Sequence, residues 1–362
     1  MGKKMRSSNI ELYRIVMMLV IIAHHLVVNS TITWQYDYSN VTGNMLFLEF
    51  FGFGGKPMID GFLLITGFFT IKSIFTVEKA LRVFLEILFY RVLIYFLFVW
   101  FGVQSFSWSG FWDASLYVFR AADMSFPATY FWLYCLTPFI NTLANALNKR
   151  QYLALLGVLL VYFTFISTVF KDVDTFSELG WYITVYLIGA YLQLHEPRLL
   201  NRAWKSGVLT LAALLACFGT ILWMNYRRAI GATDLSVYYF FSNAHKPLGL
   251  ALAVCSFQWF RHLKIRNSRV INTCAASILG VLLIHANSDT MRKQLWQIWL
   301  KIPSWYTKPW LWLYAIGCVF GIFIVCTLLD QIRIHAIEKP FFKLYRHLEE
   351  KIMCRFKQQK SI

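Results

Sequence analysis

The stretch ELYRIVMMLVIIAHHLVV, residues 11–28, is long and apolar enough to cross a lipid bilayer as one helix. It also carries Glu11 and Arg14 near one end and His24 and His25 near the other. Each helical residue rises about 1.5 Å and turns about 100°, so Arg14 and His25 lie roughly 16 Å apart along the axis and about 20° apart in direction. Their side chains therefore face the same way, whereas His24 points roughly a quarter-turn aside.

This helix face is the first candidate for a functional site. Ionisable side chains inside a membrane are costly, and they usually face a protein interior or a watery cavity. Glu11 lies one helical turn from Arg14 and is its expected ion-pair partner. Met18 and Ile21 lie between Arg14 and His25 on the same face. We therefore expect this face to form a wall of the active site.

The composition places this segment within a polytopic membrane protein. Of the 362 residues, 58% are apolar and only 15% are charged. Apolar runs recur along the chain, and no polar stretch between them is large enough for a separate domain. We predict an all-α fold, with a transmembrane domain over 1–340 and a basic cytoplasmic tail over 341–362. About ten spans are expected, at 11–29, 46–71, 83–103, 128–147, 152–170, 178–194, 206–224, 237–260, 272–290 and 310–334.

The formal charge of +17 could indicate a nucleic-acid partner, but the placement of the charges argues against one. With a cytoplasmic N-terminus, 23 of the 35 lysines and arginines fall in cytoplasmic segments and 8 in loops on the opposite side. This bias follows the positive-inside rule and predicts that both termini are cytoplasmic. The tail is expected to be attracted to anionic membrane lipid.

Other charged residues lie in or beside the next two spans. Lys56 and Asp60 are four residues apart and are able to form an ion pair on one helix face. Lys79 and Arg82 share a face at the membrane surface, where two cations suit a phosphate-bearing ligand. Anchoring of the helix by the positive-inside rule is the alternative explanation.

Two further residues are candidates on chemical grounds. Arg91 lies deep in the third span, and Glu86 is five residues away, a spacing that points to a partner elsewhere. His285 lies in the ninth span, where a lone histidine is more often a packing residue than a catalyst. The seven cysteines are dispersed without CxxC spacing, and no HExxH is present, so we predict no metal site. Acid–base or acyl-transfer chemistry by histidine is what remains.

In these motifs the chain resembles the acyltransferase-3 family of integral membrane O-acyltransferases, which modify bacterial cell-surface glycans. The first helix of that family carries an Arg or Lys, ten intervening residues and a His, as Arg14 and His25 do. Further similar segments are residues 60–69, with Thr66 where Ser is usual, Lys79 with Arg82 in place of an arginine pair, residues 132–141, residues 284–285 and residues 337–340.

The resemblance implies transfer of an acyl group, most often acetyl from acetyl-CoA, at the bacterial cytoplasmic membrane. The acceptor would be a hydroxyl of a cell-surface polysaccharide or of its lipid-linked precursor. Arg14, with Lys79, Arg82 and Arg91, would hold the anionic donor, and His25 would act as general base or transient acyl acceptor. A transporter or flippase for a carboxylate or a lipid-linked glycan is the alternative, because buried Arg and His also serve proton-coupled transport. The lack of a detectable internal repeat disfavours it.

Overall fold

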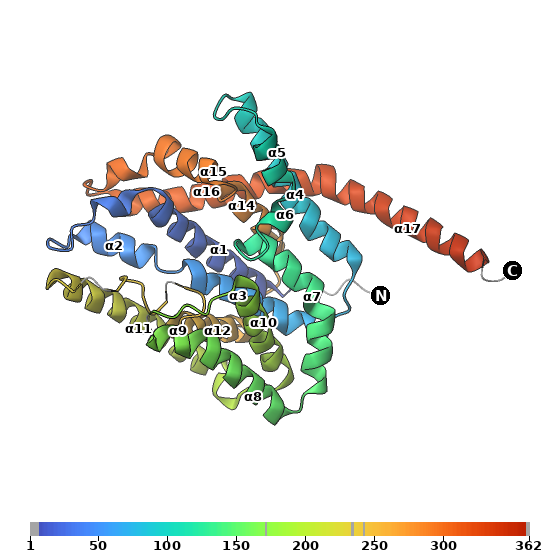
Figure 1. Cartoon of the computed structure of the whole chain (residues 1–362), viewed down its shortest axis with the longest axis horizontal. Helices are drawn as coiled ribbons and strands as arrows, with labels where there is room; N and C mark the ends of the chain where they lie inside the picture. Colours follow the sequence, from blue (N-terminus) through green and yellow to red (C-terminus); the bar gives the residue numbers. More distant parts are fainter. Residues whose placement is uncertain (1–6, 171, 233–234, 242, 360–362) are drawn as a thin grey trace.

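The computed structural model describes residues 7–170, 172–232, 235–241 and 243–359, and all regular structure in these ranges is helical (Figure 1). In chain order the elements are α1 (Ser8–Asn29), η1 (Ile32–Gln35), α2 (Gly43–Phe51), α3 (Gly55–Thr70), α4 (Val77–Trp100), α5 (Trp108–Ser115), α6 (Tyr117–Arg120), α7 (Phe126–Ala146), α8 (Lys149–Leu160), η2 (Val161–Ile166), α9 (Ser167–Val169), α10 (Glu178–Leu194), η3 (Arg198–Leu200), α11 (Ala203–Ala229), α12 (Pro247–His262), α13 (Arg269–Ala276), α14 (Ile278–His285), α15 (Asp289–Lys293), η4 (Gln294–Trp299), η5 (Ile302–Trp305), α16 (Leu311–Arg333), η6 (Ile334–Glu338) and α17 (Lys339–Gln359).

Within the described ranges, five helical segments are long and apolar enough to cross a membrane. They are α1, α4, α11, the run Lys149–Val169 and the run Leu311–Lys351. The helical, membrane-type fold is therefore confirmed. The total of about ten spans and the cytoplasmic location of the termini stay predictions.

Several predicted spans are interrupted. The second divides into α2 and α3 at a turn over residues 52–54, where Gly52 and Gly54 lower the helix propensity. Helix α12 begins only at Pro247, ten residues after the predicted start of the eighth span. The ninth divides between α13 and α14 at Ser277 and ends at His285. Such breaks occur at membrane depth where protein surrounds the freed backbone groups.

Helix α1 lies at the centre of the bundle. It packs against α3, α12, α13, α14 and α16. In its most apolar 18-residue window, 56% of the residues are buried, compared with 22% for α11. Helix α1 is therefore surrounded by protein over more of its surface than α11 is.

The beginning of α1 and the end of α16 meet at one end of the bundle, through α13. Ser8 Oγ donates to Asn272 Oδ1 at 3.0 Å. Gln331 Nε2 donates to the backbone oxygen of Thr273, also at 3.0 Å. The start of α1 and the end of α16 thus lie on the same side of the bundle.

Helices α3 and α10 approach each other closely because two glycines face the partner backbone. A Cβ on Gly67 would lie 2.0 Å from the Tyr186 oxygen, and a Cβ on Gly189 would lie 2.4 Å from the Leu64 oxygen. Any side chain at either position would separate the helices.

The predicted basic tail is helical as far as Gln359, and residues 360–362 lie outside the described residues. Helix α17 follows α16 through the π-helical turn η6 and extends away from the bundle (Figure 1). Phe341, Leu344 and Leu348 are exposed along it at helical spacing, and Lys343 is exposed between them. This pattern is typical of helices that lie at a membrane surface. The attraction of the tail to anionic lipid stays a prediction.

Candidate active site

A cavity of about 360 Å³ lies along the Arg14 face of α1. Arg14, Met18 and Ile21 line it from α1. The other walls come from α3, α4, α7, α13 and α14, through Phe62, Ile65, Thr66, Phe69, Thr70, Val83, Glu86, Phe126, Tyr130, Ala276, Ile278, Leu279 and Leu282. The three residues that the helical phase places together from Arg14 to Ile21 do share one cavity.

Arg14 lies at one end of this cavity, and Thr70, the last residue of α3, also lines it. Its Nη1 donates to Glu11 Oε2 at 2.9 Å, which confirms the predicted ion pair. The Arg14 side chain is 28% exposed, and Glu11 is its acceptor in the described part of the chain. A guanidinium carries five N–H donors, so most of them are left to bind an anionic ligand.

His25 is brought together with His285, although 260 residues separate them. His285 Nδ1 lies 2.6 Å from the backbone oxygen of Val281, which only accepts, so this nitrogen carries the proton. Neutral His285 then presents a lone pair at Nε2, and His25 Nδ1 donates to it at 3.0 Å. Nε2 of neutral His25 is consequently a lone pair able to take a proton.

The histidine pair lies one helical turn beyond the cavity. Ile21, four residues before His25, and Leu282, three residues before His285, both line it. His285 is fully buried and His25 is partly buried. The cavity therefore has a cation at one end and stops one helical turn short of a paired histidine base at the other.

The contacts of His24 position helix α1 within the bundle. Its Nδ1 donates to the backbone oxygen of Gly52 at 2.6 Å, in the turn between α2 and α3. Its ring packs so closely on Gly55 that a Cβ there would lie 2.3 Å from the His24 Cδ2 atom. His24 thus fixes α1 against the start of α3.

The predicted ion pair between Lys56 and Asp60 is wrong. Lys56 Nζ pairs instead with Glu178 Oε1 of α10 at 2.7 Å. Asp60 Oδ1 accepts from Trp181 Nε1, also of α10, at 2.9 Å. The close packing of α3 on α10 supplies partners to both residues, and this overrides the local helical spacing.

Lys79 and Arg82 differ in their surroundings. Arg82 forms ion pairs with Glu338 and with Glu78, the latter at 3.0 Å, and its guanidinium stacks on Phe342. Lys79 is exposed near the start of α4. Their binding of a donor stays a prediction.

Arg91 does not pair with Glu86, and the sequence predicts this from their spacing of five residues. It donates to the backbone oxygen of Asn287 and stacks on Tyr117, with 3.8 Å from Cζ to the ring centroid. Asn287 lies two residues after His285, so Arg91 holds the chain where α14 ends. Its contribution to donor binding stays a prediction.

A buried charged cluster at the junction of α4, α16 and η6 was missed from the sequence. Arg333 contacts Glu86 at 3.0 Å, Asp330 at 2.7 Å and Glu338 at 2.7 Å. Tyr90 Oη donates to Asp330 Oδ1 at 2.8 Å. The signal was present, because Asp330 and Arg333 are ionisable residues inside the last predicted span.

Comparison with known proteins identifies the family of this chain. A family model described as an acyltransferase domain matches residues 7–330. No curated protein and no solved structure matches the chain. The matched range contains α1 with its Arg14–His25 face and α14 with His285. Because the match covers nearly the whole chain, the protein belongs to the acyltransferase-3 family.

Proposed function

We propose that this protein is an O-acyltransferase of the bacterial cytoplasmic membrane, with both termini in the cytoplasm. It moves an acetyl group from cytoplasmic acetyl-CoA to a hydroxyl of a saccharide on the other side. The observation that carries this proposal is the cavity that begins at Arg14 and ends one turn before the His25–His285 pair.

The donor fits this cavity in charge and in length. Coenzyme A is anionic at its nucleotide end, and Arg14 has free donors for it at the predicted cytoplasmic end of the cavity. The acyl end must then reach His25, roughly 16 Å along α1, a distance that an extended pantetheine arm largely covers. The mainly apolar walls between the two residues suit this neutral arm.

In the proposed reaction, His25 Nε2 takes the proton of the acceptor hydroxyl while the hydroxyl oxygen bonds to the thioester carbonyl carbon. The carbon–sulfur bond then breaks, and coenzyme A leaves as a thiolate. The His25 imidazolium returns the proton to that sulfur, which yields the ester and free coenzyme A. His285 accepts from His25 Nδ1 and so keeps the lone pair on Nε2.

Inside-out membrane vesicles with labelled acetyl-CoA outside test the function. We expect the label to become covalently attached to saccharide within the vesicles, because donor and acceptor are used on opposite faces. Vesicles without the protein are the control. Movement of saccharide or carboxylate with no covalent acetyl label would contradict the proposal and favour a transporter.

Replacement of His285 tests the orientation of His25. We expect His285→Leu to lower kcat for acetyl transfer about tenfold, the loss expected for one hydrogen bond. KM for acetyl-CoA should change little, because the donor cavity is untouched. His285→Gln retains an acceptor for His25 Nδ1 and should restore most of kcat. Equal losses in the two variants would exclude this role and leave only packing.

A further inference from the structure

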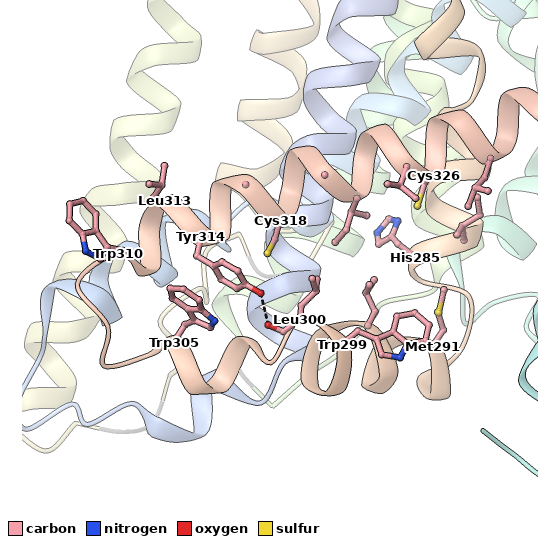
Figure 2. A pocket seen from close by; sticks show the side chains of 17 residues that line it. His285, Met291, Trp299, Leu300, Trp305, Trp310, Leu313, Tyr314, Cys318 and Cys326 are labelled. Carbon is pink, nitrogen blue, oxygen red and sulfur yellow. Dashed lines mark hydrogen bonds between the residues drawn. The ribbon is translucent and has the colours of Figure 1, made fainter. Parts of the chain in front are cut away.

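A long apolar groove runs along α16, with a volume of about 790 Å³ (Figure 2). Along α16 it is lined by a stripe with a spacing of four residues: Leu313, Gly317, Gly321, Val325 and Leu329. Sixteen helical residues span about 24 Å, most of the roughly 30 Å hydrocarbon thickness of a bilayer. The groove is therefore long enough to hold an extended hydrocarbon chain.

The groove is hollow because of two glycines. Gly317 and Gly321 are exposed, and a Cβ built on either one meets no atom within 4 Å. Across from them, Leu295 and Trp299 of η4 form the other wall. An apolar surface of this kind, open at membrane depth, is suited to hydrocarbon.

The groove passes His285 of the histidine pair. His285 and Ile284 lie on its inner wall, and His285 contacts His25 at 3.0 Å. None of its lining residues is shared with the Arg14 cavity, because α14 borders that cavity with Ile278, Leu279 and Leu282 and reaches the groove only at its last two residues. A ligand in the groove therefore reaches the pair from beyond the end of the donor cavity.

The mouth of the groove is aromatic. Figure 2 shows Trp305, Trp310 and Tyr314 gathered at this end, away from Cys326. Trp305 stacks on Tyr314 with 4.0 Å between ring centroids, and Tyr314 Oη donates to the Leu300 oxygen at 2.7 Å. These contacts hold the 300–305 segment against the start of α16.

A longer segment, residues 293–308, carries positive charge that no ion pair explains. Lys293, Lys301 and Lys308 are exposed, and no ion-pair partner is found for them among the described residues. They lie on the predicted outer side of the membrane, where the positive-inside rule disfavours lysine. Gln297 Nε2 donates to the Asn29 oxygen at 3.0 Å, so the segment lies over the end of α1. An anionic group held there would be close to His25.

We propose that this groove binds an acceptor saccharide linked through phosphate to a long polyprenyl chain. The chain lies along α16, the phosphate lies beside the lysines, and the attached sugar lies over the end of α1, four residues beyond His25. This inference rests on the proposed function and names its acceptor class. A free polysaccharide would leave the groove without an occupant, and a bulk phospholipid would not account for its course past His285.

Photolabelling of the purified protein tests the site without any turnover. The probe is a polyprenyl phosphate with a diazirine in its chain, and labelled peptides are mapped by mass spectrometry. We expect label within residues 291–329 and competition by unlabelled polyprenyl phosphate. Equal competition by phosphatidylglycerol at the same mole fraction would overturn the proposal, because the groove would then hold ordinary membrane lipid.

Filling the groove provides the matched variants. Gly317→Leu and Gly321→Leu place side chains in open space, so the fold should persist while labelling falls at least about fivefold, since the methylenes of the chain lose their buried surface. Gly219→Leu is the control, because Gly219 is an exposed glycine of α11 whose Cβ also meets nothing within 4 Å. Unchanged labelling in both groove variants would place the chain elsewhere and overturn the proposal.

The lysines are tested through charge. Lys301 has a left-handed backbone with φ of 46°, which Asn tolerates, so Lys301→Asn removes the charge without new strain. Together with Lys308→Gln it should weaken labelling about fivefold or more at low salt, with Lys→Arg at both sites as control. Lost labelling with intact acetyl transfer would overturn this inference alone, and intact labelling without transfer would overturn the proposed function alone.

Discussion

His25→Ala is expected to lower the rate of acetyl transfer about 10³-fold, the contribution of a well-placed general base. The variant removes the Nε2 lone pair that His25 presents one helical turn beyond the donor cavity. His285 does not take over the position of His25, because its side chain is fully buried and is held in place by the hydrogen bond from its Nδ1 to the Val281 oxygen. Binding of acetyl-CoA at the Arg14 end should persist.

The measurement is single-turnover transfer by purified protein at matched amounts of folded enzyme. His24→Ala is the matched control, since His24 bonds to the Gly52 oxygen and packs on Gly55. It should reduce the yield of folded protein more than turnover per molecule. Retention of more than about a tenth of the wild-type rate in His25→Ala would exclude general-base catalysis by this residue. Covalent acetyl label on His25 without acceptor would instead assign it as the acyl carrier.

Arg333→Leu is expected to destabilise the folded protein by about 3–5 kcal/mol. Arg333 is the cation shared by Glu86, Asp330 and Glu338, and its side chain is only 7% exposed. Without it, buried carboxylates at the α4–α16 junction would lose their counter-charge. Arg82 contacts only Glu338 of these three, so it is unable to compensate for the loss.

Thermal unfolding of the detergent-solubilised protein checks this expectation. Arg120→Leu is the control, because the Arg120–Asp113 pair is exposed on both sides and should contribute about 1 kcal/mol or less. A large drop in the unfolding midpoint for Arg333→Leu beside a small one for Arg120→Leu is the expected result. Similar midpoints in the two variants would show that the buried cluster does not stabilise the fold.

The sequence predicts the α1 face well because that prediction depends only on the spacing of residues within one helix. Helical phase alone places Arg14 and His25 on one side, and it pairs Arg14 with Glu11, as the structure confirms. It does not reveal that His25 meets His285, since that contact depends on how α14 packs beside α1. The same limit explains the wrong partner for Lys56, because Glu178 comes from a helix 122 residues later.

Hydropathy also conceals breaks in the helices. The segments 46–71 and 272–290 are mainly apolar, so each is predicted as one span. In the structure each divides, at residues 52–54, where His24 Nδ1 donates to the Gly52 oxygen, and at Ser277, whose Oγ accepts from Gln331 Nε2. These two spans are the least regular of the ten in sequence, and the glycines near residue 52 are the visible signal of the first break.

The separation of the Arg14 cavity from the α16 groove has a consequence for the reaction cycle. The two spaces have no lining residue in common. In the proposed reaction the acetyl group passes from one bound molecule to the other, and neither molecule has to cross the membrane. The enzyme then needs no alternation between inward-open and outward-open states, which a transporter requires.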